Sequence, residues 1–135
     1  RDNARTPMQW DSSASAGFTT GKPWLKISSD YRRYNAEDEA QRKDSVLNFF
    51  KKAIKLRKNH EALVYGEFVK IDNISKPLYC YYREYENEKY YIELNLSKSV
   101  LPRPVETTNY ELILSTNDNF TDNLKAFEGK VYKVK

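Results

Sequence analysis

The side chains that could carry catalysis are few and scattered along the chain. Because the 135 residues include one histidine, His60, and one cysteine, Cys80, we expect neither a structural zinc site nor a Cys–His nucleophile pair. Carboxylates are more numerous, and the candidates in loops and on charged faces are Asp2, Asp11, Asp30, Glu37, Asp38 and Glu39. Their spacing marks no acid and base pair, so we interpret them as solvated surface charge. By itself, the chain is catalytically incomplete.

The single histidine and the single cysteine both have structural interpretations. His60 follows a lysine-rich helical pattern in KNHEAL, where we expect it to cap a helix end. Cys80 lies in LYCYYR, a stretch typical of a strand, and is expected to be a small buried hydrophobic residue. A lone cysteine allows no internal disulfide and favours a reducing compartment, so we expect a cytoplasmic protein.

Residues 1–35 have no helical or strand periodicity and predict an extended loop, interrupted by Gly17, Gly21 and Pro23. The loop opens with RDNARTPMQWDSSASAGFTTGKPWL, which contains two arginines, two tryptophans and two prolines. Terminal residues of a free-standing domain are usually dispensable. A segment with two arginines, two tryptophans and two prolines is not what we expect of dispensable residues. The segment is therefore expected to contact something specific.

A helix is predicted in DSVLNFFKKAIKLRKN, with Asp44 as its N-cap and Asn59 near its end. A short helical turn in NAEDEAQ precedes it. Apolar side chains recur on one face of the helix, at Val46, Phe49, Phe50, Ala53, Ile54 and Leu56. A wide apolar stripe must be buried, and a single β-domain offers little surface for it. We therefore expect that part of its partner lies outside these 135 residues.

From Tyr65 onward the pattern changes to an alternation of apolar and polar residues. The alternating stretches are EFVKI, PLYCYYREY, KYYIELNL, TNYELILS, DNLKAF and GKVYKVK, each bounded by turn residues. They predict six or seven antiparallel strands in two packed sheets, an all-β sandwich of about seventy residues. The clearest hairpin is YYREYENEKYYIEL, with a charged tip from Glu86 to Lys89. The expected fold class is mainly β.

Charge and hydropathy argue against several function classes. The net charge of +4 is spread over mixed-sign stretches, so no nucleic-acid partner is expected. No apolar run reaches the roughly 18 residues of a membrane span, and no signal-peptide pattern is present, so no membrane association is expected. Asn-x-Ser/Thr sequons occur at Asn73, Asn95 and Asn119, and we interpret them as chance occurrences in a chain rich in these residues.

Several stretches together resemble the C-terminal portion of the α-glucosidases of glycoside hydrolase family thirteen. They are RTPMQWD, AGFTTGKPWL, DSVLNFFKKAIKLRK and ALVYGEF. The likeness is greatest to the oligo-1,6-glucosidases, with α-1,4-glucosidases, sucrose isomerases, dextran glucosidases and trehalose-6-phosphate hydrolases as neighbours. It runs from Arg1 to about Phe68, and beyond that it is mainly one of layout. The resemblance implies that residues 1–63 are the last βα loop and final outer helix of a (β/α)8 barrel, and that 64–135 form a C-terminal β-sandwich.

The resemblance also implies a retaining mechanism with an Asp nucleophile, a Glu acid/base and a second Asp, none of which maps onto this chain. Arg1 and Arg5 do carry over as substrate-site residues. Arg1 is expected to reach the non-reducing glucose, and Arg5 to brace the loop or nearby carboxylates; alternatively, both only tie the loop to the barrel. Packing between loop, barrel and sandwich is expected of Met8, Trp10, Phe18 and Trp24, with sugar stacking as the alternative for either tryptophan.

The implied function is the release of terminal α-linked glucose from short oligosaccharides by a larger enzyme. We expect this chain to bind no cofactor and no metal. The chain alone is expected to be inactive and to be able to self-associate through its helix face. A different class remains open, namely a non-catalytic glucosidase-like scaffold such as the heavy chain of a transporter. The preferred linkage, α-1,6 or α-1,4 or that of a phosphorylated disaccharide, is not encoded in these residues.

Overall fold

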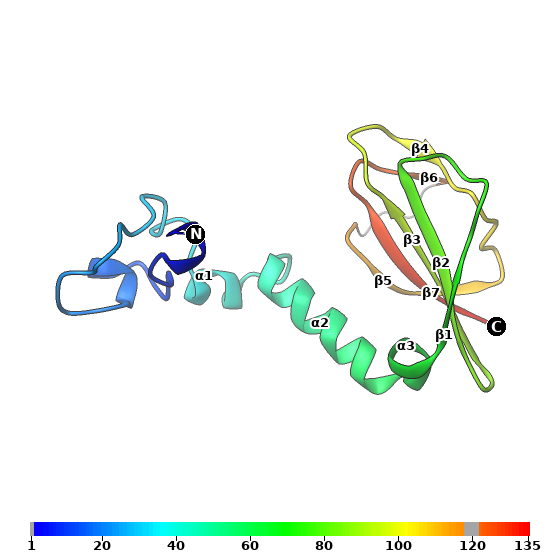
Figure 1. Ribbon diagram of the computed structural model, residues 1–135, viewed down its shortest axis with the longest axis horizontal. Helices are drawn as coiled ribbons and strands as arrows, with labels where there is room; N and C mark the ends of the chain where they lie inside the picture. The colour runs from blue at the N-terminus through cyan, green and yellow to red at the C-terminus, as the bar shows by residue number, and fades with distance from the viewer. Residues whose placement is uncertain (1, 118–121) are drawn as a thin grey trace. The chain divides into compact units, whose positions relative to one another are not determined.

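The computed structural model describes residues 2–117 and 122–135 of the chain (Figure 1). Its internal contacts divide the chain into two compact units, Arg1–Lys52 and Ala53–Lys135. Helix α2 (Val46–Asn59) contributes its first half to the N-terminal unit and its second half to the C-terminal unit. The described elements are mainly β, and the helices precede the strands.

The N-terminal unit is largely loop, as the missing periodicity predicts. It contains two short 3-10 helices, η1 (Asp2–Arg5) and η2 (Ala14–Gly17), followed by helix α1 (Ala36–Gln41). Asn35 caps α1, because its side-chain oxygen accepts a hydrogen bond from the backbone N–H of Asp38 at 2.9 Å. The helical turn expected in NAEDEAQ is thereby confirmed.

Helix α2 begins one residue later than the sequence predicts. The N-cap is Ser45 and not Asp44, because the Ser45 hydroxyl accepts from the Asn48 N–H at 3.1 Å and its carbonyl accepts from the Phe49 N–H at 2.9 Å. The side-chain amide of Asn48 donates to the carbonyls of Glu39 and Arg42 at 3.1 and 2.8 Å. These bonds fix the start of α2 against the end of α1.

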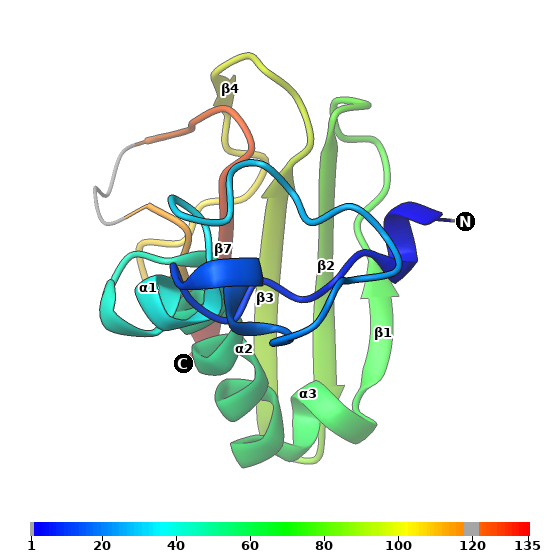
Figure 2. The ribbon, with the colours of Figure 1, turned by 90° about the vertical axis from the view of Figure 1, so that its left-hand side faces the viewer.

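The C-terminal unit is built on a five-stranded antiparallel sheet in the order β1-β2-β3-β7-β5. Its strands are β1 (Glu67–Lys70), β2 (Leu78–Tyr85), β3 (Glu88–Asn95), β5 (Tyr110–Ser115) and β7 (Gly129–Val134). Figure 2 shows β1, β2, β3 and β7 side by side. Tyr85 pairs with Glu88, so the hairpin expected in YYREYENEKYYIEL is confirmed, with Glu86 and Asn87 as its two-residue loop.

The second sheet is smaller than the alternation predicts. It consists of β4 (Leu101–Pro102) paired with β6 (Asn123–Leu124). Of the stretch DNLKAF, which predicts a full strand, two residues are in β6. Pro102 and Pro104 lack the N–H that would continue a ladder through β4, which explains why that strand stays short.

Each face of the five-stranded sheet carries its own apolar core. On one face, Tyr91 and Tyr132 pack with Leu78, Cys80 and Leu124. On the other face, Tyr90 and Ile92 pack against Ala62 and Leu63 of helix α3 (Glu61–Tyr65). The periodicity does not predict α3, because five residues make little more than one turn. The helix ends at Gly66, where a Cβ atom would lie 2.3 Å from the Ala62 carbonyl oxygen.

Candidate functional site

The sequence places the candidate site residues at the start of the N-terminal unit. Arg5 is the last residue of η1, and its side chain is exposed. Arg1, the other expected substrate-site residue, lies outside the described residues. The structure therefore shows where one of the two arginines lies, and their assignment to a substrate stays a prediction.

Gln9 ties the RTPMQWD stretch to the loop that precedes α1. Its side-chain amide donates to the Tyr34 carbonyl at 2.9 Å and to the Asp30 carboxylate at 3.2 Å. The backbone adds two bonds, from the Ala36 N–H to the Gln9 carbonyl and from the Glu37 N–H to the Trp10 carbonyl, both at 2.9 Å. These four bonds close the long loop at its base, so that its two ends lie together.

Asp11 organises the second half of the motif. Its carboxylate accepts hydrogen bonds from the backbone N–H and the hydroxyl of Ser13, and these bonds hold its pKa below the usual value. The backbone then passes through three successive positive φ angles, 55° at Ser15, 58° at Ala16 and 64° at Gly17. Gly17 is favoured here, because a Cβ atom would lie 2.3 Å from an Asp11 carboxylate oxygen and the Asp11 side chain would have to shift. The glycine of AGF thus fits the close approach of the Asp11 carboxylate.

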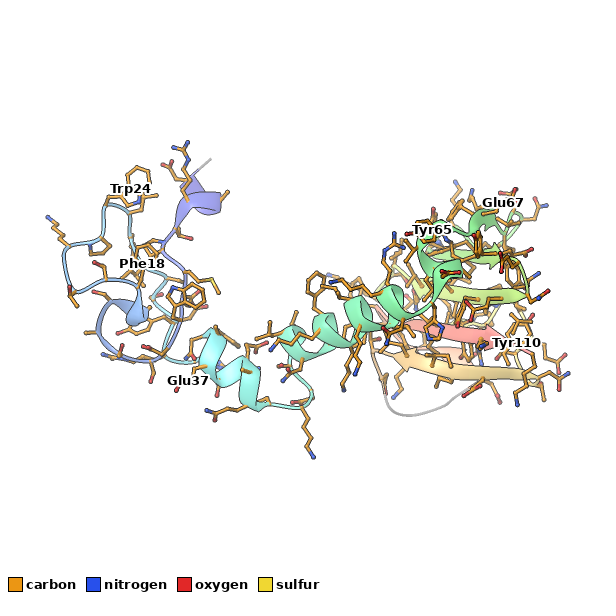
Figure 3. The ribbon with its side chains drawn as sticks, turned by 90° about the horizontal axis from the view of Figure 1, so that it is seen from below. Phe18, Trp24, Glu37, Tyr65, Glu67 and Tyr110 are labelled. Atoms are coloured by element: carbon orange, nitrogen blue, oxygen red, sulfur yellow. The ribbon has the colours of Figure 1, made fainter. Side chains whose placement is uncertain are left out.

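The apolar side chains of this loop are largely exposed. Figure 3 shows Phe18 and Trp24 on the loop, and Trp24 is 73% exposed. Met8 and Trp10 are exposed as well. These four side chains therefore leave much of their surface uncovered within the described residues, and their packing against a barrel stays a prediction.

Two carboxylates of this unit, those of Asp11 and Asp30, are held in their charged form. Hydrogen bonding by the Ser28 hydroxyl lowers the pKa of Asp30, as Ser13 does for Asp11, so both groups are charged acceptors at neutral pH. The described residues also include no cluster of three or more His, Cys, Asp or Glu side chains that could hold a metal ion. The chemistry that this unit offers is hydrogen bonding and charge, without a paired acid and base.

His60 acts differently from the expected helix cap. It precedes α3 as its N-cap residue, but its side chain makes no capping bond there. Instead, its Nδ1 lies 2.6 Å from the Tyr90 hydroxyl and 3.6 Å from a Glu88 carboxylate oxygen. Burial favours the neutral carboxyl of Glu88, but the contacts with His60 and Lys133 outweigh it and lower its pKa. This group ties α3 to β3 and has a structural role.

Cys80 is buried in β2, which confirms the expectation of a small core residue. Burial raises the pKa of its thiol. Asn95, one of the three sequon asparagines, is also buried, and its amide donates to the carbonyls of Ser99 at 2.7 Å and Lys125 at 2.8 Å. A glycan cannot occupy that nitrogen in the folded protein. Of the other two sequons, Asn73 is exposed and Asn119 lies outside the described residues.

Sequence reasoning missed a group of charged residues inside the C-terminal unit. Glu93 is fully buried, and one of its carboxylate oxygens lies 2.7 Å from Nη2 of Arg103. The same nitrogen donates to the Tyr132 hydroxyl at 2.6 Å. Lys130 and Glu128, both buried, lie 3.3 Å apart. The alternation in KYYIELNL puts Glu93 on the same face as Tyr91, which is the signal that could have identified it as an inward-facing charge.

No helix among residues 2–117 and 122–135 combines the length and apolar character required to cross a membrane.

The comparisons with known proteins agree with the resemblance in the sequence. Residues 1–66 match the family described as "Alpha amylase, catalytic domain". The oligo-1,6-glucosidase of Bacillus cereus is 38% identical over 146 residues, which cover 100% of this chain and 26% of that protein. The oligo-1,6-glucosidase of Heyndrickxia coagulans is 39% identical over 134 residues, covering 98% and 24%.

A solved structure shows the same fold. The isomaltulose synthase from Klebsiella sp. LX3 superimposes with a TM-score of 0.90 at 35% identity, over 99% of this chain and 26% of that one. Residues 1–66 thus match the α-amylase catalytic-domain family, and the whole chain is similar to oligo-1,6-glucosidases. It spans about a quarter of the length of the relatives it matches.

Proposed function

We propose that this chain is the C-terminal part of an exo-acting, retaining α-glucosidase of the oligo-1,6-glucosidase type. The observation that carries the proposal is the identity of 38–39% to two oligo-1,6-glucosidases over nearly the whole chain. In this proposal, the complete enzyme acts in the cytoplasm and releases terminal α-linked glucose from short oligosaccharides.

In this proposal, the chain contains parts of two domains. Residues 1–63 are the last βα loop and the final outer helix of a (β/α)8 barrel, and residues 64–135 are a C-terminal β-sandwich. The end of the family match at residue 66, next to the start of β1 at Glu67, supports this division. The exposed stripe of α2 supports it too, since Val46 is 80% exposed and Phe50 61%. In a complete barrel, that stripe would be covered.

The N-terminal loop has the position of a substrate-binding element in this proposal. Enzymes with (β/α)8 barrels build their active sites from the loops after the strands. A guanidinium group presents a planar fork of donors, so Arg1 can hold adjacent sugar hydroxyls and a neighbouring carboxylate together. Arg5, exposed at the end of η1, braces the loop or a carboxylate of the barrel.

The isolated chain has no catalytic activity in this proposal. A retaining glycosidase needs a nucleophile and an acid whose carboxyl groups lie about 5–5.5 Å apart. Neither role maps onto a carboxylate of this chain, and those of Asp11 and Asp30 accept hydrogen bonds from the hydroxyls of Ser13 and Ser28. The catalytic residues are therefore assigned to earlier parts of the complete protein.

Glucose release from isomaltose, maltose and trehalose 6-phosphate, measured for the complete protein and for the isolated chain, tests this proposal. The complete protein is expected to cleave isomaltose, and the isolated chain to cleave none of the three. Conversion of sucrose to isomaltulose without glucose release would contradict the proposed reaction. Detectable glucose release by the isolated chain would contradict the assignment of the catalytic residues to other parts of the protein.

A further inference from the structure

The C-terminal unit contains a pocket that the proposed function does not use. It has a volume of about 530 Å³ and lies between β5, the end of β7 and the segment 103–108. Small-molecule sites in proteins commonly have volumes of about 300–1,000 Å³. The pocket is therefore large enough for a small ligand.

The base of the pocket is rigid. Arg103, whose side chain is 8% exposed, is held by the buried Glu93 carboxylate at 2.7 Å and by the Tyr132 hydroxyl at 2.6 Å. Its guanidinium carbon also lies 5.0 Å from the centre of the Tyr132 ring. These contacts with Glu93 and Tyr132 fix the orientation of the guanidinium group, so it needs little reorganisation to meet a ligand. Its charge is already balanced by Glu93.

The walls of the pocket combine an apolar surface with polar groups. Tyr110 is half-buried and, together with Leu112 of the same strand, forms the apolar part; Figure 3 shows Tyr110 on the sheet. The polar part of the lining includes the exposed carboxylates of Glu106 and Asp122. Glu106 also accepts a hydrogen bond from the Thr108 hydroxyl at 3.0 Å.

We propose that this pocket binds a neutral saccharide unit. A guanidinium group only donates hydrogen bonds, a carboxylate only accepts them, and a hydroxyl does both, so such a lining suits a ligand whose many hydroxyls donate and accept. An aromatic wall next to these groups suits the apolar C–H face of a sugar ring.

The charges of the pocket argue against an anion. Glu93 neutralises Arg103, and Glu106 and Asp122 leave the lining with excess negative charge. A phosphate group would be repelled by these carboxylates. The inference depends on the lining of the pocket and not on the proposed hydrolysis.

The test is calorimetric titration of the complete protein with isomaltose in which sulfur replaces the glycosidic oxygen, so that it is not cleaved. The pocket variant Glu106→Ala/Thr108→Ala changes two exposed side chains. The control Glu111→Ala removes the same charge from β5 without changing the pocket lining. We expect the pocket variant to bind one saccharide fewer than the wild type, and the control to bind the same number.

An equal number of bound saccharides in the wild type and the pocket variant would overturn the inference. Displacement of the saccharide from the pocket by inorganic phosphate or by a diamine would overturn it as well. If circular dichroism shows that the pocket variant is misfolded, Asp122→Asn provides a second test, with an expected loss of at least tenfold in affinity at one site. Failure of the proposed function is seen separately, as absence of glucose release from isomaltose.

Discussion

The hydroxyl of Tyr90 joins the helix α3 region to the sheet, and its pKa is higher than that of an ordinary tyrosine. It lies 2.6 Å from Nδ1 of His60 and donates to a Glu88 carboxylate oxygen at 3.5 Å. Burial of the ring, followed by the charge of Glu88, raises the pKa of Tyr90 to about 12. Burial also raises the pKa of Tyr91 and Tyr132 on the opposite face. The folded state therefore requires neutral phenols on both faces of the sheet.

Stability should accordingly fall in alkaline solution. A tyrosine in the unfolded chain ionises near pH 10, whereas Tyr90 in the folded protein holds its proton to about pH 12. Its contribution is complete below pH 10 and is lost as the pH rises toward 12, because the unfolded state then binds fewer protons. We expect the thermal midpoint to decrease between pH 9 and pH 11.5. Tyr90→Phe should show a smaller decrease, and an equal decrease would contradict the assignment to Tyr90.

Arg1 is the residue on which the proposed substrate role depends. In the complete enzyme, Arg1→Ala is expected to lower kcat/KM for a short α-glucoside at least tenfold, about 1.4 kcal/mol, with little change in the thermal midpoint. Contacts that tighten as the sugar ring distorts affect rate as well as binding. Arg1→Lys keeps the charge but loses the fork, so it should remain impaired.

Arg5→Ala serves as the comparison and is expected to lower the thermal midpoint of the same enzyme, because it releases the loop. A wild-type kcat/KM in Arg1→Ala, combined with a loss of stability, would show that Arg1 only ties the loop to the barrel.

At the scale of elements, the turn around Asp11 contains one glycine with a positive φ angle, Gly17. Gly17→Ala is expected to destabilise this unit by roughly 1–2 kcal/mol, because an Ala residue must adopt a left-handed backbone there and its Cβ displaces Asp11. Gly21→Ala is the matched control, since its nearest neighbour would be the Thr19 hydroxyl at 3.7 Å. Limited proteolysis measures the difference. Equal cleavage of the two variants would show that the Asp11 turn does not order the loop.

The β2–β3 hairpin carries strain in its loop. Glu86 has a φ of 49°, whereas Asn87 is not in the positive-φ region. Glu86→Gly should therefore raise the free energy of unfolding by roughly 0.4–1 kcal/mol, since glycine adopts this conformation without a steric penalty. Asn87→Gly should not stabilise the protein. Urea unfolding midpoints compare the two variants, and a stabilisation by Asn87→Gly alone would contradict this interpretation of the loop.

The sequence predicts the long strands β2 and β3 because each is rich in strand-forming residues and bounded by turn residues, although their burial does not alternate strictly. It does not predict β4, where prolines mask the pattern, or α3, which is too short for a helical period. The pair of Glu93 and Arg103 was also missed, because Arg103 lies in the irregular segment after β4, and the sequence does not show where that segment runs against the sheet. At the candidate site, the glycines and prolines predicted a loop, but the bonds of Gln9 and Asp11 that shape it required coordinates.

At the scale of the whole molecule, the described chain leaves Val46, Phe50 and Ile54 of the α2 stripe exposed, whereas Leu56 at its end packs against the core around Tyr90 and Ile92. Phe50 is 61% exposed, and no residue of α2 is buried. Exposed apolar patches commonly mark an interface. The continuous stripe of α2 thus agrees with the expectation that its partner lies elsewhere, in the complete protein or in a second copy of this chain.

The isolated chain is therefore expected to self-associate through α2. Sedimentation velocity should show a species larger than a monomer at micromolar concentration. Phe50→Lys, which places a charge in the stripe, should shift the equilibrium to monomer, whereas Lys51→Ala on the charged face should not. A wild-type chain that stays monomeric at high concentration would exclude association by this helix face.

The burial of Asn95 has a consequence for how the protein can be produced. Asn95, Leu96 and Ser97 form a sequon, but the Asn95 amide is enclosed by carbonyls of Ser99 and Lys125. Oligosaccharide transfer takes place on nascent chains, before such an enclosure exists, and a glycan is too bulky for the core. Export through a eukaryotic secretory route would thus modify the very nitrogen that folding needs, and the yield of native protein should suffer there while bacterial expression is unaffected.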